Sequence, residues 1–440
     1  MNIAESAALA VAARERGWEE AASADGADLV LLNTCSVRAT AEQRVLGRLA
    51  HYAACKKKRS LSGGKRTFAL VLAGCMAERI GERLKTEYPA LDYTMGTSER
   101  SRFPLILEAV EKGTSSVVCD EKPVFSFSPF HLYEVNPSQN VFRSFVPIMH
   151  GCDNFCSYCI VPYVRGREVS REPEAILEEI RLLSGKGVRE VTLLGQNVNS
   201  YRWGGLDFPG LLERIAGELE TEGGSGIRWV RFLSSHPKDF SPELIRVMAE
   251  NPVFCRHIHL CVQHGSNRML AAMNRRYTRE LYLDLVDRLR SALPGLSLST
   301  DFLVGFPGET DGDFDKLLSL MDKVKFLYAY MYHYNPREGT AAFSLPGRVS
   351  AEVKRERLSR VIALQKRHTG ELLKARLGKE VTVLIEGISR KNADELICRT
   401  ERDEMAVVSG SGDLLGTFAR LTLSSLKGNT FRCQMVPGTF

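Results

Sequence analysis

The sequence predicts an α/β protein in three parts: an amino-terminal domain with a parallel sheet, a partial (βα)6 TIM-like barrel and a small carboxy-terminal β-barrel. Two continuous apolar runs at 27–35 and 67–75, separated by helical patterns, are typical of buried parallel strands. From about residue 141, six further strand patterns alternate with helical ones, which favours most of a TIM-like barrel rather than a complete one. Short strands with glycine turns follow residue 378 and indicate a small β-barrel.

The same patterns predict the domain limits. Residues 1–115 form the first domain, and 116–140, which carry proline and serine without a period, form a linker. The partial barrel is expected within 141–370 and the small barrel within 371–437. The strands of the partial barrel are expected at 144–152, 190–198, 228–235, 257–263, 296–306 and 326–335.

Composition limits the class of protein. With 44% hydrophobic and 25% charged residues, the chain is typical of globular proteins, and its longest apolar runs are far shorter than the roughly 18 residues of a membrane span. The amino terminus lacks the pattern of a signal peptide, so the 11 cysteines are expected to be reduced thiols in the cytoplasm. A net charge of +6 permits a polyanionic partner without requiring one. We expect a monomer with no membrane partner.

Three cysteines lie on the loop that follows the first predicted barrel strand: Cys152, Cys156 and Cys159. With 11 cysteines among 440 residues, their spacing would arise by chance about 0.007 times per chain. Thiolates bind zinc and iron–sulfur clusters. Zinc would need a fourth ligand, such as His150 or a distant pair formed by Cys255 and Cys261. Three ligands on one loop favour a single 4Fe–4S cluster with one open iron.

The stretch "CDNFCSYC" (152–159) resembles the cluster loop of radical S-adenosylmethionine (SAM) enzymes. The resemblance implies that the open iron binds the amine and carboxylate of SAM and that the reduced cluster splits the sulfonium to give a deoxyadenosyl radical. Tyr158 holds the position where this family places an aromatic side chain near the adenine.

Further stretches narrow the resemblance to the methylthiotransferase family. They are "NTCSVR" (33–38), "AGCMAER" (73–79), "SYCIVPYVRGREVSR" (157–171), "LLGQNVNSY" (193–201), "VQHGSNRMLAAMNRRYT" (262–278) and "STDFLVGFPGET" (299–310). The last β-rich segment is similar to the family's RNA-binding TRAM domain, so the resemblance covers almost the whole chain. "GQNVNSY" is most similar to the MiaB-type branch, which adds a methylthio group to isopentenyl-adenosine beside the tRNA anticodon.

The resemblance implies two 4Fe–4S clusters and SAM as cofactors, with tRNA, a reducing electron donor and a sulfur source as partners. One SAM would methylate sulfur at an auxiliary cluster, and a second would yield the radical that abstracts hydrogen from the adenine ring. The three cysteines of the loop would hold the radical-generating cluster. Cys35 and Cys75, each at the end of a predicted amino-terminal strand, would hold part of the auxiliary cluster.

Polar residues at the ends of barrel strands are candidates for binding the cofactor. Gly195, Gln196 and Asn197 could hold its amino-acid end, although a tight turn after the strand would need only the glycine. Gln263 and Asp301 could accept or donate hydrogen bonds to ribose hydroxyls, with simple capping as the alternative.

Arginines that follow the cluster loop, Arg165, Arg167 and Arg171, could neutralise RNA phosphates or the charge of the cluster. In the tail, Arg399 and Arg402 are candidate RNA contacts. Acidic residues at 403 and 404, where relatives usually carry Asn and a basic residue, predict weaker RNA affinity through this module.

Relatives in this family carry a third auxiliary cysteine in a "G-C-Q-M-N" stretch, whose end matches the opening "MNIAESAAL". We therefore expect Met1 to be an internal methionine of a longer reading frame. A chain that starts at Met1 is expected to have a gap in its parallel sheet and to build the radical cluster but no stable auxiliary one. Cys55, in a helical run, is a poor replacement for the missing ligand.

Two alternatives remain open on the sequence. One is methylthiolation of threonylcarbamoyl-adenosine in tRNA or of a ribosomal protein, within the same family. The other, from a different class, is a zinc-stabilised RNA-binding protein without catalytic activity.

Overall fold

The computed structural model describes residues 2–36, 39–61, 68–114, 142–221 and 226–438. The linker predicted at 116–140 lies outside these residues, and the predicted domain limits stay predictions. By its internal contacts the chain divides into two compact units. The amino-terminal unit comprises Met1–Pro137, Gly151–Asp153 and Cys159–Glu168, and the barrel unit comprises Ser138–His150, Asn154–Tyr158 and Val169–Phe440. The cysteine loop therefore contributes residues to both units.

The amino-terminal unit contains a parallel sheet in the order β1 (Leu29–Thr34), β2 (Ala69–Gly74) and β3 (Tyr93–Met95). Every residue of β2 is buried, as its position between two strands requires. β1 and β2 pair directly along their whole length, from Leu29 opposite Ala69 to Thr34 opposite Gly74. The described sheet is therefore continuous, and the expected gap between its strands is absent.

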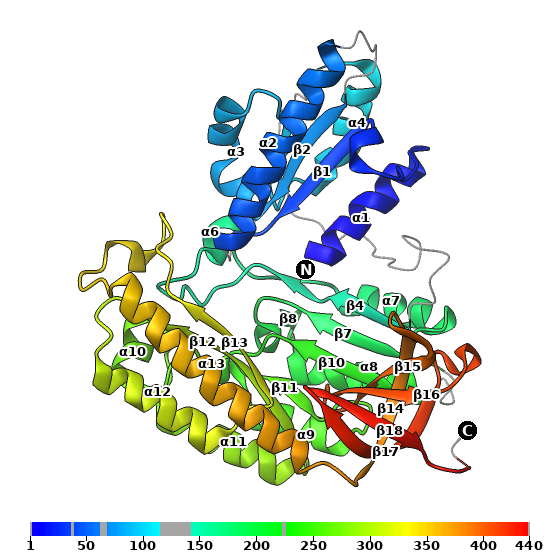
Figure 1. Ribbon diagram of the computed structural model, residues 1–440, viewed down its shortest axis with the longest axis vertical. Helices are drawn as coiled ribbons and strands as arrows, with labels where there is room; N and C mark the ends of the chain where they lie inside the picture. The colour runs from blue at the N-terminus through cyan, green and yellow to red at the C-terminus, as the bar shows by residue number, and fades with distance from the viewer. Residues whose placement is uncertain (1, 37–38, 62–67, 115–141, 222–225, 439–440) are drawn as a thin grey trace. The chain divides into compact units, whose positions relative to one another are not determined.

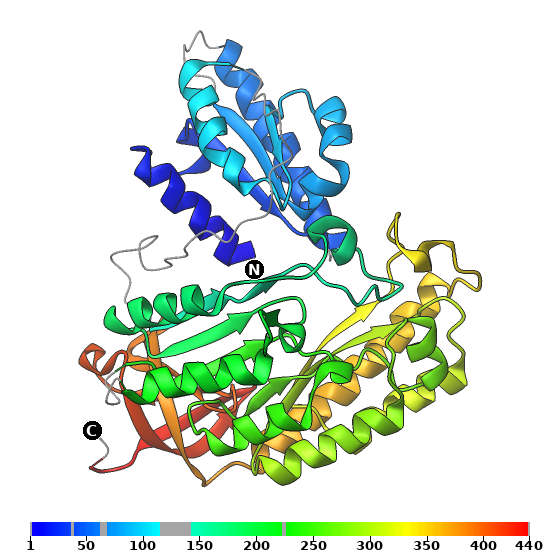
Figure 2. The ribbon, with the colours of Figure 1, turned by 180° about the vertical axis from the view of Figure 1, so that it is seen from behind.

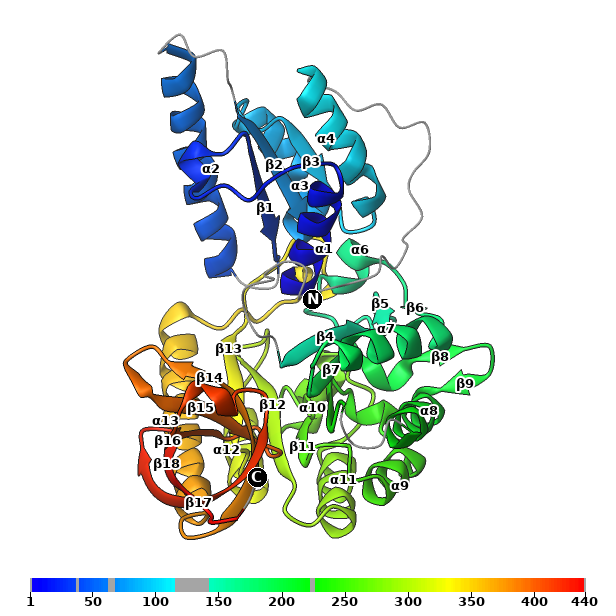
Figure 3. The same ribbon diagram turned by 90° about the vertical axis from the view of Figure 1, so that its right-hand side faces the viewer.

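Helices cover both faces of this sheet, and they are α1 (Asn2–Glu15), α2 (Ala39–Leu61), α3 (Cys75–Glu87) and α4 (Phe103–Lys112). Successive side chains of a strand point to opposite faces. Leu70 and Leu72 accordingly pack in a cluster with Leu49 of α2, whereas Val71 packs in a second cluster with Leu107 of α4. Figure 3 shows α2 and α4 on opposite sides of the strands.

The barrel unit contains the six predicted parallel strands, which confirms the α/β fold class (Figure 1). They are β4 (Arg143–Pro147), β7 (Glu190–Leu194), β10 (Trp229–Leu233), β11 (His257–His259), β12 (Ser297–Val304) and β13 (Tyr328–His333). They form two three-stranded sheets, β10-β7-β4 and β11-β12-β13. Parallel bridges between Val230 and Phe254 and between Ser235 and Leu260 join the two sheets.

Helices follow these strands and cover the outside of the sheets (Figure 2). The longer ones are α7 (Pro173–Gly185), α8 (Phe208–Thr221), α9 (Pro242–Glu250), α11 (Arg279–Ala292), α12 (Asp311–Val324) and α13 (Ala351–Lys374). None of the helices in the described part of the chain is both long and apolar enough to cross a membrane.

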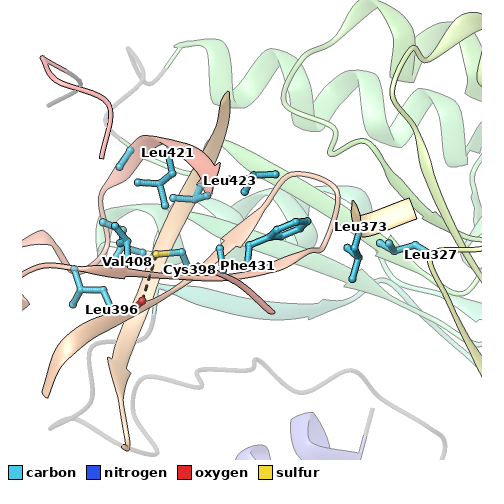
Figure 4. Packing of buried hydrophobic residues seen from close by; sticks show 12 residues of the cluster. Leu327, Leu373, Leu396, Cys398, Val408, Leu421, Leu423 and Phe431 are labelled. Atoms are coloured by element: carbon cyan, nitrogen blue, oxygen red, sulfur yellow. Dashed lines mark hydrogen bonds between the residues drawn. The ribbon is translucent and has the colours of Figure 1, made fainter. Parts of the chain in front are cut away.

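The predicted small β-barrel is also confirmed: five strands close in the order β14-β15-β16-β18-β17. Their bounds are β14 (Glu380–Ser389), β15 (Asn392–Thr400), β16 (Met405–Ser409), β17 (Phe418–Lys427) and β18 (Thr430–Met435). Side chains that point inward fill its core, among them Leu396, Cys398, Leu421 and Phe431 (Figure 4). Full closure leaves this sheet without edge strands.

The small barrel and the six-stranded core are joined by buried polar contacts. Arg231 of β10 donates to the carbonyl oxygens of Thr400 and Glu401, both at 2.8 Å. The Tyr328 hydroxyl of β13 donates to Asp403 at 2.8 Å. Trp229 also packs edge-to-face on Phe418, with ring centroids 4.9 Å apart. These contacts explain why the small barrel belongs to the same compact unit as the core.

Candidate cluster and cofactor site

The three cysteines of the loop lie between the short strand β5 (Met149–His150) and helix α6 (Val161–Arg165), shortly after β4. Gly151 opens the loop with a φ of +78°, and a Cβ at this position would lie 2.0 Å from the carbonyl oxygen of Arg167. Only glycine fits this turn. The amide of Cys152 donates to the carbonyl oxygen of Gly166 at 3.2 Å, which folds the start of the loop onto the residues after α6.

Cys156, which is buried, accepts a hydrogen bond on its Sγ from Nη1 of Arg275 at 3.3 Å. The Arg275 guanidinium is itself buried and also donates to the carbonyl oxygen of Cys261 at 2.5 Å. Asn274 donates to the carbonyl oxygen of Phe155 at 2.9 Å. The turn that carries Asn274 and Arg275 therefore holds the middle of the cysteine loop, and a buried cation lies against one thiol. Sequence reasoning used "MNRRYT" only as a mark of resemblance and missed this contact.

Tyr158 packs against a buried apolar cluster that includes Met269, Met273, Phe306 and Tyr334. Its neighbour Ser157 is held by two hydrogen bonds to the same turn, from its amide to the Met273 carbonyl and from its hydroxyl to the Ala272 carbonyl. An aromatic ring is thus held over an apolar surface directly beside the cysteines.

The donor set fits an iron–sulfur cluster. Three thiols within one short loop are the ligands that such clusters prefer, and the described cysteines form no disulfide that would consume them. Cys255 and Cys261, the alternative pair of zinc ligands, lie among different groups of residues. Cys255 packs with Trp229 and Leu384 beneath the small barrel, whereas Cys261 lies with His259 and Asp301. The structure thus supplies no second zinc knuckle from Cys255 and Cys261 together.

Cys35 and Cys75 follow neighbouring parallel strands at the same edge of the amino-terminal sheet, because Thr34 and Gly74 are register partners. Gly74 adopts a φ of +88°, and a Cβ there would lie 2.6 Å from both the Asn33 side chain and the Thr34 carbonyl oxygen. Burial raises the pKa of the Cys75 thiol, and the Arg165 guanidinium acts in the opposite direction. A buried thiol beside a cation suits a metal ligand, since metals bind the thiolate.

Arg165 lies inside the amino-terminal unit. Its Nη1 is 2.7 Å from Oε1 of the buried Glu5, and it also hydrogen-bonds the Cys75 thiol. The Glu5 carboxylate is shared with Arg100 at 2.5 Å. Of the two roles considered for Arg165, this position favours neutralising charge at the cysteines over contacting RNA. Arg167 differs, because 72% of its side chain is exposed, and it forms an ion pair with Asp153 at 2.9 Å.

The candidate residues at the strand ends differ in how many of their contacts are already made within the protein. Asn197 is buried, donates to Asp239 at 2.7 Å and accepts from the His236 amide, so it cross-links two loops. Gly195 lets Met149 approach, since a Cβ would lie 2.5 Å from its Cγ. Both contacts favour the turn interpretation. Gln196 differs, because its Oε1 has no hydrogen-bond partner among the described residues.

Gln263 has a φ of +69°, and its backbone bridges to β12 through the Asp301 carbonyl and the Leu303 amide. The Asp301 carboxylate lies 3.2 Å from Nε2 of His259. Burial acts to raise the pKa of Asp301, but the hydrogen bond and charge of His259 outweigh it and lower that pKa. Gln263 is therefore placed by its backbone, and Asp301 is kept ionised as a hydrogen-bond acceptor.

Sequence reasoning missed the cluster of His259, Cys261 and Asp301, whose ligand atoms all lie within 4.8 Å of one another. The signal was present in the alternation of "HIHLC", because residues two apart on a strand share a face. Asp301 thus has partners on or beside the neighbouring strand, which the sequence around Asp301 alone does not predict.

The other predicted arginines are engaged within the fold. Arg171 is buried and pairs with Glu179. Arg399 pairs with Glu386 at 2.9 Å and with Asp403 at 2.8 Å. Arg402 lies 3.7 Å from Glu404, and burial lowers its pKa. The side chains of Arg399 and Arg402 are only 19% and 16% exposed, so they contribute little open cationic surface.

Comparisons with known proteins agree with this arrangement. Residues 146–321 match the radical SAM superfamily, and residues 1–96 match a group described as uncharacterized protein family UPF0004. The chain is 48% identical to a tRNA-2-methylthio-N(6)-dimethylallyladenosine synthase of Treponema denticola, over 99% of this chain and 97% of that protein. The chain belongs to this synthase family. Proteins of the same name from Treponema pallidum (strain Nichols) and Syntrophus aciditrophicus are 45% and 41% identical, covering 99% of the chain and 96% and 92% of theirs.

Solved structures support the fold. The radical SAM methyltransferase TsrM from Kitasatospora setae, with cobalamin and a [4Fe-4S] cluster, superposes with a TM-score of 0.59 at 14% identity, over 77% of this chain and 73% of that one. The cobalamin-dependent radical SAM enzyme OxsB gives 0.53 at 11% identity, over 82% and 53%. As a radical SAM enzyme, this family member uses SAM and a 4Fe–4S cluster, and the fit of the three thiols described above is consistent with that.

Proposed function

We propose that this enzyme adds a methylthio group to isopentenyl-adenosine (dimethylallyl-adenosine) beside the anticodon of tRNA. The observation that carries the proposal is the three-thiol loop held by Arg275, in a chain similar over 99% of its length to synthases of that name. The three relatives named above all carry the dimethylallyladenosine name, which disfavours threonylcarbamoyl-adenosine or a ribosomal protein as the substrate. The radical SAM match likewise disfavours a non-catalytic zinc protein.

When bound, the cluster and SAM supply the radical chemistry. Cys152, Cys156 and Cys159 hold the cluster, and Arg275 fixes the thiol of Cys156 while its charge offsets that of the thiolates. Tyr158, packed over Met269 and Phe306, offers an aromatic face to the adenine of SAM and keeps water from that side.

Polar groups at the strand ends orient the rest of the cofactor. Gln196 has an amide oxygen available for the amino-acid end of SAM, and Gly195 and Asn197 shape the turn that presents it. The ionised Asp301 accepts from a ribose hydroxyl, beside the backbone-anchored Gln263.

We further propose that Cys35 and Cys75 hold part of an auxiliary 4Fe–4S cluster at the edge of the amino-terminal sheet. The shared register of β1 and β2 and the Arg165 guanidinium beside Cys75 support this. Arg165 offsets the negative charge that thiolates and sulfide bring into a buried site, and Glu5 and Arg100 hold Arg165 in place.

Substrate tRNA would contact exposed cations such as Arg167 and the small β-barrel, within which Arg399 and Arg402 mainly support the fold. The reaction also needs a reducing electron donor and a sulfur source. We place the enzyme in the cytoplasm, as a monomer, where isopentenyl-bearing tRNA is available.

The decisive experiment compares two tRNA preparations, one with and one without the isopentenyl group, in single turnovers with the reconstituted full-length enzyme. Mass spectrometry of the nucleosides should detect the methylthio product only from the isopentenyl tRNA. Equal turnover of unmodified adenosine, or a methylthio product on threonylcarbamoyl-adenosine, would overturn the substrate assignment. A deletion strain analysed in the same way should lack only the methylthio derivative of isopentenyl-adenosine and should keep isopentenyl-adenosine itself.

A further inference from the structure

A second cluster of metal-ligating side chains lies in the amino-terminal unit, on α2 and the short helix η1 (Ala24–Gly26). His51 and Cys55 are four residues apart on α2, so both project from the same helix face. Asp25 of η1 faces them. No motif singled out this group, because Asp25 is 26 residues from His51 in the sequence.

The distances between the three donor atoms match a tetrahedral metal site. Asp25 Oδ1 lies 3.3 Å from His51 Nε2, and Cys55 Sγ lies 3.8 Å from Asp25 Oδ1 and 3.7 Å from His51 Nε2. Zinc bonds of about 2.0 Å to nitrogen and oxygen and about 2.3 Å to sulfur, at tetrahedral angles, place such donors roughly 3.3 and 3.5 Å apart. A cation could therefore bind here with movements of a few tenths of an ångström.

The fold holds these ligands in place before any metal binds. Cys55 packs against the core cluster beneath α2, and Tyr52 beside His51 packs on Phe68. At the end of α2, Arg59 donates to the carbonyl oxygen of Ala27 at 3.0 Å and thereby ties the end of η1 to the helix. The ammonium group of Lys56, the residue after Cys55, forms an ion pair with Asp92 at 2.5 Å and not with the three donor atoms.

We propose that Asp25, His51 and Cys55 bind a zinc ion whose fourth position is open to water. One carboxylate, one imidazole and one thiolate form a mixed ligand set that suits zinc, and zinc outcompetes ferrous iron at nitrogen and sulfur ligands. Because the side chains of His51 and Asp25 are 57% and 67% exposed, the ion can enter directly from solvent. The ion would fasten η1 to α2 and so fix the segment that enters β1, the strand that Cys35 directly follows.

The test uses the full-length protein with its iron–sulfur clusters assembled, so that cluster cysteines are occupied, and counts zinc and iron after exchange against a weak chelator. We expect about one zinc per chain in the wild type. His51→Ala and Cys55→Ser should lose the zinc while keeping their iron. His51→Cys, which replaces one good ligand by another, should retain it. Cys433→Ser, which changes a half-buried thiol of the small barrel, is the matched control and should retain it too.

X-ray absorption at the zinc edge should show one sulfur and two or three nitrogen or oxygen ligands. A wild type without zinc, zinc that persists in His51→Ala, or a spectrum with several sulfur ligands would overturn the proposal. These outcomes do not depend on the identity of the tRNA substrate, so the proposed function and the zinc site can fail separately.

Discussion

Arg275 donates a hydrogen bond from Nη1 to Sγ of Cys156 at 3.3 Å, and both side chains are buried. Nη2 of the same guanidinium holds the Cys261 carbonyl at 2.5 Å, so the cation has a fixed position against one cluster thiol. A fixed positive charge stabilises the more negative, reduced state of a nearby iron–sulfur cluster, and hydrogen bonds to its sulfurs act in the same direction.

We therefore expect Arg275→Met to lower the reduction potential of the cluster on this loop, on the order of tens of millivolts. Arg275→Lys keeps the charge and should recover most of the difference. The measurement is a redox titration followed by electron paramagnetic resonance on the reconstituted protein. Arg276→Met, which changes an exposed neighbour, is the control, and an unchanged potential in Arg275→Met would show that the contact does not tune the cluster.

The second prediction concerns the thiol itself. Cys156→Ala should abolish both the cleavage of SAM and the methylthio product, because a cluster held by two thiolates is labile. The iron content should fall together with the release of deoxyadenosine. Cys433→Ala removes a thiol from the small barrel and should leave both measurements unchanged. Undiminished deoxyadenosine release by Cys156→Ala would contradict the proposed ligand set.

The two arginines that follow the cluster loop should behave differently. Arg167 is largely exposed and is expected to contact a phosphate, so Arg167→Ala should weaken tRNA binding. In a plot of the logarithm of the binding constant against the logarithm of the salt concentration, the slope should become less steep by about 0.7–0.9 for each lost contact. Its cleavage of SAM without tRNA should not change. Arg165→Ala instead removes buried hydrogen bonds to Glu5 and Cys75, at a cost on the order of 1.5–3 kcal/mol for each charged hydrogen bond.

Binding of tRNA at several salt concentrations and thermal unfolding of the two variants separate these effects. Arg165→Ala should lower the melting temperature and the iron bound beside Cys75. Arg167→Ala should do neither. An Arg165→Ala protein with normal stability but a weaker salt dependence of tRNA binding would show that Arg165 contacts RNA instead.

Much of this fold was predictable because the strands that build the site are continuous apolar runs. β2, with all six residues buried, carries that signal most directly. The core strands carry it less uniformly, since β12 includes polar residues and β13 is only partly buried. β3 escaped prediction because three residues are too few for any period. β15 is hard to predict from the sequence, because its first half, "NADE", is polar and its pattern becomes apolar only toward Cys398.

The roles of the charged residues were less predictable, since their partners are far away in the sequence. Arg165 is buried because of Glu5, 160 positions earlier, and no local pattern around "YVRGRE" shows this. Arg399 and Asp403 looked like features of an RNA-binding surface with conflicting charges. In the structure they pair with each other at 2.8 Å, and Asp403 also binds Tyr328 of the core. Asp403, one of the two acidic residues expected to weaken RNA binding, thus attaches the small barrel to the core.

That attachment gives the last prediction. Asp403 accepts from Tyr328 and Arg399, both at 2.8 Å. Burial acts to raise its pKa, but the charges of His257, Arg399 and Arg231 and the Tyr328 hydrogen bond outweigh it and lower the pKa to about 2 from an ordinary 3.8. His257 contributes its charge only in acid, because burial lowers its own pKa to about 3. A carboxyl whose pKa is lower in the folded protein stabilises it above the ordinary value and loses this effect as the pH falls through about 2. The difference corresponds to about 2 kcal/mol.

We therefore expect Asp403→Asn to lower the free energy of unfolding by about 2 kcal/mol at pH 7. Between pH 4 and pH 2 the free energy of unfolding of this variant should fall less steeply than that of the wild type. Asparagine is the fitting replacement, because residue 403 has a φ of +66° and asparagine tolerates that conformation. Denaturant unfolding across this pH range makes the measurement, with the exposed Asp413→Asn as control. If Asp403→Asn keeps the acid profile of the wild type, this carboxylate does not hold the small barrel to the core. The attachment would then rest on Arg231 and the Trp229–Phe418 contact.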